Sequence, residues 1–486
     1  MTKAVQFNSY LFILALLPAF VICYFLLSRI RPQLGKAAII GFSIWFYAAG
    51  GWDSAAILGA SIVGNLLLAL WITRAKRFRK GVLALTIVLN VLLLAYFKYY
   101  HLTVTTINDL GGQLAVRDLI APLGISFFTF QQIMYAVSLY RGEPERVNVP
   151  DYLCFVLFFP KILMGPLAEP KDLISQFNDT GRKRLDWANI ACGLKLFGFG
   201  LFKKLVLADT FARGVSWGFG NLKSATAGDL FLVMLCYTFQ IYFDFSGYSD
   251  MATGVAKMVN IELPINFDSP YKATSVRDFW KRWHISLTSG FLTKYLYFPL
   301  GGSRKGTVRT YLNIFIVFLI SGMWHGANWT FLLWGAIHGV LMIVERLCDK
   351  PLQKVHAPVR WLFTFVAVAL LRMLFLTDTI AQWGEILGKM FSFQDMSVSA
   401  GLLTAVRMPE TAFLIDKLDF LALHKDVRGL PMLVSMVSAF LICMVPENNY
   451  RSRDRLTAVN MIFCAIAFVW AFLCLGSESV FVYFNF

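Results

Sequence analysis

The chain has 486 residues, of which 57% are hydrophobic and only 15% are Asp, Glu, Lys or Arg, and its mean hydropathy is +0.61. Soluble domains carry about 25% charged residues, so a soluble enzyme, a disordered protein and a secreted disulfide scaffold are excluded, and the bilayer must be the main solvent. The net charge of +16 comes from Lys and Arg in short stretches between apolar runs. This is the positive-inside pattern of membrane proteins and argues against nucleic acid as a partner.

Apolar runs along the chain predict an all-α fold: a multi-pass transmembrane helical bundle with roughly 11–13 membrane segments. The first run, residues 10–27, is followed by Arg29 and Arg31 without a cleavage site, so we expect it to remain as a membrane helix. The further runs lie at residues 37–50, 54–73, 81–97, 119–139, 151–168, 188–208, 228–245, 311–344, 360–377, 431–446 and 459–476. No repeat or linker interrupts them, so residues 1–486 are predicted to form a single integral-membrane domain.

Basic clusters orient these segments, because short cytoplasmic loops are rich in Lys and Arg. The densest cluster predicts a cytoplasmic loop and consists of Arg74, Lys76, Arg77, Arg79 and Lys80. A second cytoplasmic loop is predicted at Arg451, Arg453 and Arg455. Both termini are therefore expected outside a cell (inner) membrane, and residues 391–430 are expected to form an extracytoplasmic loop with interfacial helices.

One uncharged stretch does not fit a simple helix count. Residues 310–344 hold no Lys, Arg, Asp or Glu, and they are too long for one span of about 20 residues and short for two. His325 lies in the middle, between Gly322 and Gly326, which can break a helix or pack closely. An ionisable residue at membrane depth either performs chemistry or joins two helices through neutral hydrogen bonds. Asn328, three positions on, could share the face of His325 and fix its tautomer.

Three other features carry open alternatives. His338 is expected to pack rather than react. The basic, aromatic stretch 277–309 is either an interfacial amphipathic segment or a vestibule for an anionic cytosolic ligand. Asp244 and Asp250 either pair with a buried cation or cap a helix at a turn. The cysteines are scattered singly without zinc spacing, so no metal site is predicted.

Several motifs follow one another along the chain: Phe7–Tyr10, Pro122–Gln131, Phe159–Lys161 with Gly165–Pro166, Ile241–Met251, Phe267–Tyr271, the Arg277–His284 element and the Ser321–Trp329 segment. In this order they resemble the membrane-bound O-acyltransferase (MBOAT) family, and more narrowly its bacterial alginate-acetylating branch. The resemblance is strongest over residues 7–392, and residues 393–486 are less characteristic. One departure is that residues 288–295 are one residue longer than the family pattern, which affects any role for Lys294.

The resemblance implies a bundle with a central conduit and an intramembrane histidine. It makes His325 the catalytic residue and His284 the second family histidine. It further implies no cofactor, acetyl-CoA as a cytosolic acyl donor, an extracytoplasmic acetyltransferase as partner protein and an exported polysaccharide such as alginate as acceptor. The residues expected to bind substrate are Trp324, Asn328, Lys281, Arg282, Arg304 and Lys305.

The chemistry agrees with this reading, because a buried, neutral imidazole can take the proton of an attacking hydroxyl while burial excludes water. His284 would orient a reactant or pass a proton, and an acyl-histidine intermediate is an alternative route. Three other functions compete: D-alanyl transfer to teichoic acid, transport of lipid-linked sugars, and a purely structural role in a synthase complex. The form of the His325 motif, Trp324 to Trp329, favours the acetylating branch.

Overall fold

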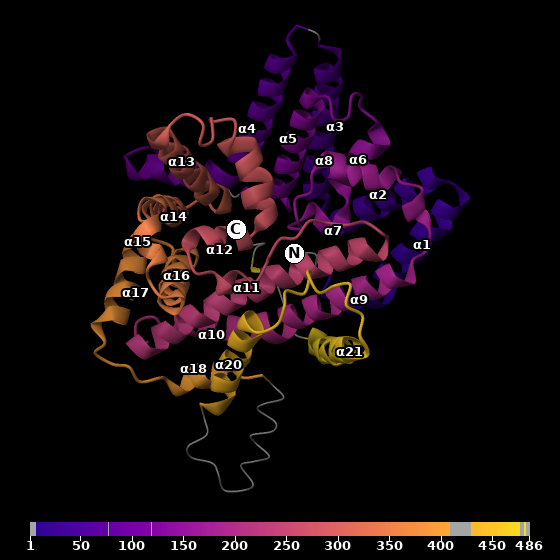
Figure 1. Ribbon diagram of the computed structural model, residues 1–486. Coiled ribbons are helices and arrows are strands. Elements are labelled where there is room, and N and C mark those ends of the chain that lie inside the picture. Colours follow the sequence, from indigo (N-terminus) through magenta and orange to yellow (C-terminus); the bar gives the residue numbers. More distant parts are fainter. Residues whose placement is uncertain (1–5, 76, 118, 409–428, 477–480, 483–486) are drawn as a thin grey trace.

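The structure is a computed structural model that describes residues 6–75, 77–117, 119–408, 429–476 and 481–482. Lys76 of the predicted basic cluster and half of the predicted loop at 391–430, namely residues 409–428, lie outside the described residues. Every regular element in the described part is helical, which confirms the all-α prediction. Figure 1 shows the long α11 crossing the middle of the molecule, with α1 to α3 and α5 to α8 on one side, α13 to α17 on the other, and α4 reaching α13.

The first half of the chain combines the long α3 and α4 with shorter, often interrupted helices. They are η1 (Phe12–Leu16), α1 (Leu17–Ile30), α2 (Pro32–Ala48), α3 (Trp52–Arg74), α4 (Arg79–Asp109), α5 (Ile125–Arg141), α6 (Val149–Leu157), α7 (Phe159–Ile162), α8 (Pro170–Asn178), η2 (Gly181–Lys183), α9 (Trp187–Phe202), η3 (Lys203–Ala208) and α10 (Asp209–Gly220). The second half contains α11 (Ala227–Met258), η4 (Pro270–Lys272), α12 (Val276–Arg282), η5 (Ser286–Tyr297), α13 (Thr307–His325), α14 (Trp329–Leu347), α15 (Asp349–Gln353), α16 (Ala357–Arg372), η6 (Met373–Phe375), α17 (Ile380–Ser392), α18 (Ala400–Ala405), α20 (Leu430–Met444), α21 (Ala458–Leu473) and η7 (Cys474–Gly476).

Eight helical stretches among the described residues are long and apolar enough to cross a bilayer, so the chain is a multi-pass membrane protein. Several other predicted segments are shorter. The run predicted at 151–168 splits at Phe158 into α6 and α7, and α2, α5 and α20 have 17, 17 and 15 residues. Large apolar side chains are exposed on the peripheral spans, as expected where lipid is the solvent.

The central helix α11 begins with a capping box. Asp229 N donates to Thr226 Oγ1 over 3.0 Å, and Thr226 N donates to Asp229 Oδ2 over 3.1 Å, which satisfies two amides that the first turn leaves open. The helix then packs along α9 through paired glycines, because a Cβ on Gly254 would lie 2.6 Å from the carbonyl oxygen of Gly193. Only glycine permits such an approach, and α11 is buried over most of its length.

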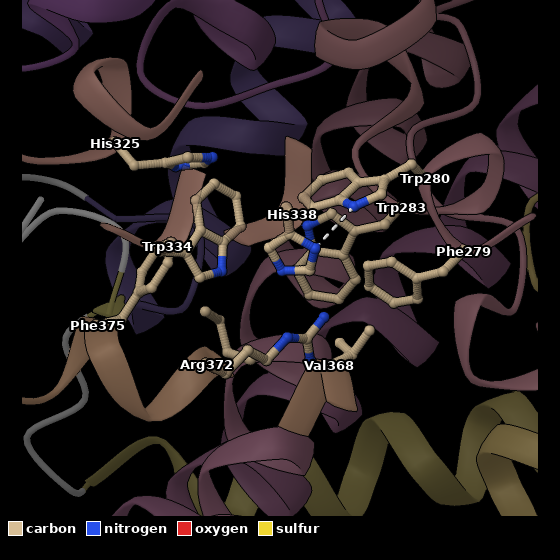
Figure 2. Close-up of a pocket in the computed structure, with 10 residues that line it drawn as sticks. Phe279, Trp280, Trp283, His325, Trp334, His338, Val368, Arg372 and Phe375 are labelled. Carbon is tan, nitrogen blue, oxygen red and sulfur yellow. Dashed lines mark hydrogen bonds between the residues drawn. The ribbon is translucent and has the colours of Figure 1, made fainter. Parts of the chain in front are cut away.

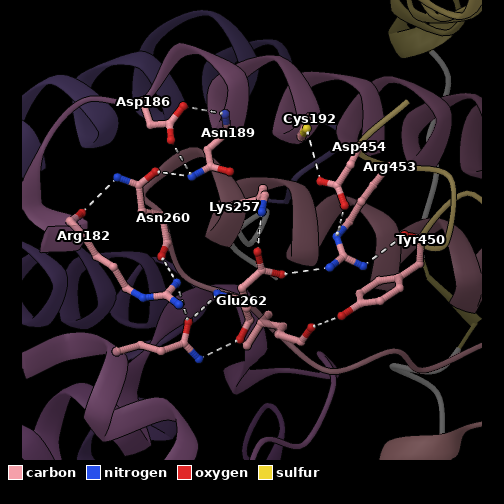
Figure 3. Close-up of polar contacts among 12 residues, drawn as sticks. Arg182, Asp186, Asn189, Cys192, Lys257, Asn260, Glu262, Tyr450, Arg453 and Asp454 are labelled. Atoms are coloured by element: carbon pink, nitrogen blue, oxygen red, sulfur yellow. Dashed lines mark hydrogen bonds and ion pairs between the residues drawn. The ribbon is translucent and has the colours of Figure 1, made fainter. Parts of the chain in front are cut away.

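A network of polar contacts marks one side of the helical bundle. On this side, Arg451 binds Asp268 with two hydrogen bonds of 2.9 and 2.7 Å, and Arg453 reaches Glu262 over 3.3 Å. Figure 3 shows that Asn260 and Arg182 join the same polar network just beyond the end of α11. The predicted basic loop at 451–455 therefore lies on the side where α11 ends, and we call this the basic side.

The uncharged stretch 310–344 forms a hairpin of two helices. Helices α13 and α14 have 19 residues each and are joined by a short turn. Both glycines act as the sequence suggests. Gly326 follows the last residue of α13, and Gly322 packs so closely that a Cβ there would lie 2.3 Å from the carbonyl oxygen of Phe331. Gly335 meets α13 in the same way, 2.4 Å from the oxygen of Phe318.

Gly322→Ala should therefore force α13 and α14 apart. Overpacking of this kind costs about 1–3 kcal/mol, so we expect a lower midpoint of thermal unfolding for the full-length protein in detergent. Gly384→Ala is the matched control, because it is also helical and a Cβ there meets nothing within 4 Å. Equal midpoints for the two variants would contradict the close packing of the hairpin.

Candidate active site

His325 is the last residue of α13 and is almost fully buried, with 4% of its surface exposed. Its ring is enclosed by aromatic side chains from three elements. Ring centroids lie 4.8 Å away for Trp324, 5.2 Å for Trp334 of α14 and 5.4 Å for Phe375 of η6. A histidine held among apolar rings is kept from bulk water, which suits proton transfer in a dry site.

The end of α13 is fixed by α4, because the last carbonyls of a helix need external donors. Tyr99 Oη donates to the carbonyl oxygen of Met323, and Lys98 Nζ donates to that of Trp324. Lys98 Nζ also donates to the carbonyl oxygen of His325 over 3.0 Å. Two side chains from a single turn of α4 thus hold the backbone that carries His325.

His284 lies between α12 and η5, is fully buried and has a φ of 47°. A positive φ on a residue other than glycine is unusual and clusters at functional sites. Its Nδ1 lies 3.1 Å from Asn266 Oδ1, which also accepts from Ser286 Oγ over 2.8 Å. Asn266 Nδ2 donates to Ser249 Oγ over 3.1 Å. This network makes Oδ1 an acceptor, so His284 Nδ1 carries the proton and Nε2 carries the lone pair.

Trp324 joins the two histidines. Its ring lies 4.8 Å from that of His325 and 6.0 Å from that of His284. The Trp324 ring also stacks on Phe130, at a centroid distance of 5.4 Å, and meets Phe127 of α5 edge-on at 5.6 Å. Segments that are far apart in sequence, near residues 127, 284 and 325, therefore build one aromatic cluster around both histidines.

His325 lies between two cavities. The Lys98 cavity, of about 90 Å³, is lined by Lys98, residues 121–127, Leu163, Trp324 and His325. The Arg372 cavity, of about 20 Å³, is shown in Figure 2 and is lined by Ile241, Phe279, Trp280, Trp283, His325, Trp334, His338, Val368, Arg372 and Phe375. A third cavity, of about 170 Å³, shares Trp280 with the Arg372 cavity and also contacts Arg277 and Lys281.

Asn328 departs from the prediction. The expectation that it shares a helical face with His325 is wrong, because α13 ends at His325 and Asn328 is the N-cap of α14. Its Oδ1 accepts from Thr330 N over 3.2 Å, and its Nδ2 donates to the carbonyl oxygen of Asp378 over 2.8 Å. Its predicted contact with substrate stays a prediction.

The four basic residues predicted to bind substrate belong to two places. Lys281 is exposed on α12, and Arg282 beside it pairs with Asp278 over 2.9 Å. Arg304 and Lys305 are exposed in the turn before α13. No hydrogen bond or ion pair joins the two pairs among the described residues, so their shared role also stays a prediction.

The segment with the extra residue is a π-helix, η5, whose wider turn accommodates an additional residue. Lys294 on η5 points to Glu169 over 2.8 Å. The two acids that the sequence left undecided both form ion pairs rather than caps. Asp244 pairs with Lys204 and Asp250 with Lys203, each over 2.7 Å.

Two basic side chains at the site were missed from the sequence, Lys98 and Arg372. Each lies in an otherwise apolar helical run, and an ionisable residue in such a run is a functional candidate by default. That signal was available at both positions. His338, expected to pack, does pack against Trp280 and Trp334, but it also lines the Arg372 cavity with His325.

The fold and the site together define a class of protein: a multi-pass helical membrane protein with a buried histidine between two cavities. The sequence model of the MBOAT, membrane-bound O-acyltransferase family, matches residues 67–377. This chain belongs to that family, and it is an acyltransferase.

Named relatives agree with this assignment. The chain is 36% identical to a peptidoglycan O-acetyltransferase of Helicobacter pylori, over 99% of this chain and 97% of the relative. It is 37% identical to a probable alginate O-acetylase of Pseudomonas putida, over 81% of each chain. A teichoic acid D-alanyltransferase of Streptococcus thermophilus is 30% identical over 47% of this chain and 58% of the relative.

Proposed function

We propose that this protein takes an acetyl group from acetyl-CoA at the cytosolic face and passes it through the membrane to O-acetylate a polysaccharide outside. The observation that carries this proposal is the position of His325 between two cavities. The Arg372 cavity borders the third cavity, which Arg277 and Lys281 line. Both of these residues lie on α12, and the carbonyl oxygen of Arg282 at the end of α12 accepts from the backbone N–H of Asp268 on the basic side. The Lys98 cavity is lined by residues 121–127. These residues follow the C-terminal end of α4, whereas the predicted cytoplasmic cluster at residues 74–80 lies at its N-terminal end.

In the proposed reaction, His325 takes the proton of the acceptor hydroxyl as the hydroxyl oxygen attacks the thioester carbonyl carbon. The new C–O bond forms, the C–S bond breaks, and the proton passes from His325 to the departing thiolate of CoA. His284 Nε2, with its lone pair fixed by Asn266, orients the acceptor or relays the proton. The aromatic rings around His325 exclude water, which would otherwise hydrolyse the thioester.

Two polymers are candidate acceptors, and the names of the relatives supply them. We place peptidoglycan first, because that relative aligns over 99% of this chain, whereas the alginate relative aligns over 81%. An alginate-like exopolysaccharide, expected from the motifs, is the second. In either case a separate extracytoplasmic acetyltransferase would supply the acceptor hydroxyl at His325 and then pass the acetyl group to the polymer. The D-alanyl relative covers only 47% of the chain.

The test is the ester-linked acetate released by mild alkali from purified peptidoglycan and from secreted polysaccharide. A deletion strain and its complemented strain are compared, and ester-linked D-alanine is measured in the same samples. We expect acetate to fall on one polymer while the amount of polymer is unchanged. Loss of D-alanine instead would support the teichoic acid alternative, and loss of the polymer itself would support transport.

Asn266→Ala is expected to lower acetate transfer about tenfold, because a partner that fixes the tautomer of a working histidine contributes about 10–100-fold. His284 would lose the acceptor that holds its Nδ1 proton. Asn448→Ala is the control, since within the described part of the chain that buried side-chain amide binds only the backbone oxygen of Phe267 and the backbone N–H of Tyr450. Unchanged transfer in Asn266→Ala, at equal membrane levels, would remove His284 from the mechanism.

A further inference from the structure

Arg372 is a buried cation at the end of α16, with 4% of its surface exposed. Its guanidinium lies 3.9 Å from the ring centroid of Trp283, 5.2 Å from that of Tyr271 and 5.4 Å from that of Phe279. Among the described residues no carboxylate forms an ion pair with it. A cation in such surroundings is costly to keep, so its retention calls for a functional reason.

One edge of this guanidinium is used within the protein and the other is not. Nη1 donates to the hydroxyl of Tyr271 and, over 3.5 Å, to the carbonyl oxygen of Thr238. Nη2 is buried and has no acceptor within the described residues. A charged donor left without an acceptor is destabilising by more than a neutral one. Figure 2 shows the guanidinium directed at the cavity, below His338.

Apart from the imidazole of His325, which is the base of the proposed reaction, the other polar groups of the Arg372 cavity are also donors. Trp334 Nε1 has no acceptor within the described residues. Trp280 Nε1 donates to His338 Nδ1 over 3.3 Å, so the neutral His338 carries its proton on Nε2. The lining residues contribute no carboxylate, amide or hydroxyl side chain. A cavity whose polar groups are donors, apart from the basic imidazole of His325, is complementary to an oxygen atom.

The size of the cavity limits what that oxygen belongs to. Its volume of about 20 Å³ is close to the space of one water-sized group, since about 10–15 Å³ is the minimum for a water. Phosphate groups and sugar rings are too large, whereas the carbonyl of a two-carbon acyl group is of suitable size. Trp334 and Phe375 close the cavity next to His325.

We propose that the Arg372 cavity is the acyl pocket of the enzyme, in which Arg372 Nη2 and Trp334 Nε1 donate hydrogen bonds to the carbonyl oxygen of the acetyl thioester. This inference rests on the proposed function. When the acceptor oxygen adds to the carbonyl carbon, the carbonyl oxygen becomes negatively charged, and a fixed cation stabilises it. The charge returns to the carbonyl as the C–S bond breaks. The same walls restrict the acyl group to acetyl.

The test uses inside-out membrane vesicles from a deletion strain that carries the full-length protein, with release of free thiol from acetyl-CoA or propionyl-CoA as the readout. Removing one such donor typically lowers kcat about 10²–10³-fold. We expect Arg372→Gln to lose kcat by about 100-fold with a donor KM within about threefold. Arg372→Lys, which keeps the charge, should recover part of the loss. Arg360→Gln on the same helix is the matched control.

A second variant separates this role from a purely structural one. Phe375→Leu enlarges the pocket, so the ratio of propionyl to acetyl transfer should rise at least about tenfold, since one methylene in a fitted pocket changes specificity about 10–200-fold. A folding defect lowers both rates and leaves their ratio unchanged. If the wild type releases no thiol from acetyl-CoA, the proposed function fails and this inference with it. If the wild type is active, an active Arg372→Gln variant or an unchanged acyl ratio in Phe375→Leu overturns the acyl pocket alone.

Discussion

His325→Ala is expected to abolish ester-linked acetate on the polymer, with a loss of about 10³-fold, because a positioned general base contributes about 10²–10⁴-fold. Among the described residues, the imidazole is the one titratable side chain that lines both the Lys98 cavity and the Arg372 cavity. His325→Gln keeps much of the volume and the capacity for hydrogen bonds but cannot take the proton, so it should be equally inactive. The measurement is alkali-released acetate at matched membrane levels of each variant.

The matched control is His356→Ala, which removes an exposed histidine at the start of α16. Its acetate should equal that of the wild type. If His325→Ala retains acetate, His325 is a packing residue and the proposed mechanism is wrong. If His325→Ala eliminates the polymer itself while the protein remains in the membrane, the transport alternative gains instead.

Hydrophobicity along the sequence predicts the all-α membrane fold. It does not predict how closely two helices pack or where a helix ends. With charged residues as its limits, the stretch 310–344 is too long for one span and short for two. In the structure α13 begins at Thr307 and α14 ends at Leu347, so Arg309 and Glu345 lie inside the helix ends. Two spans fit because both helices extend beyond the uncharged stretch and the turn between them is short, while Gly322 and Gly335 let the two helices pack closely.

At the site, the sequence predicts the residues that belong to recognisable motifs, but it does not predict the residues that other helices contribute. His325, Trp324 and His284 were singled out, and the structure brings the three rings together. Lys98 and Arg372 could not be assigned to the same place, because neither periodicity nor spacing relates α4 or α16 to α13. The error at Asn328 has a similar cause: helical spacing was extended past Gly326, where the helix ends.

Lys98→Met is expected to lower acetate transfer about 100-fold, which makes Lys98 a positioning residue. Its Nζ is the donor for the carbonyl oxygens of both Trp324 and His325. Without that donor, the end of α13 is free to move relative to α4, and a displacement of about 1 Å of a working group costs on the order of 10²-fold in rate. The loss should appear in kcat, with the KM for acetyl-CoA within about threefold.

Two further variants distinguish positioning from general stability. Tyr99→Phe removes only the donor to Met323, one residue further from the histidine, and should cost less than about tenfold because His325 keeps its own tie. Lys98→Arg supplies donors again and should restore much of the rate, whereas a lost packing interaction would not be restored by the larger guanidinium. If Lys98→Met and Tyr99→Phe lose similar activity, and each loss follows the fall in that variant's unfolding midpoint, the contact of α4 with α13 contributes to stability alone. A fall confined to kcat and reversed by Lys98→Arg would instead show that α4 sets the position of His325 between the two cavities.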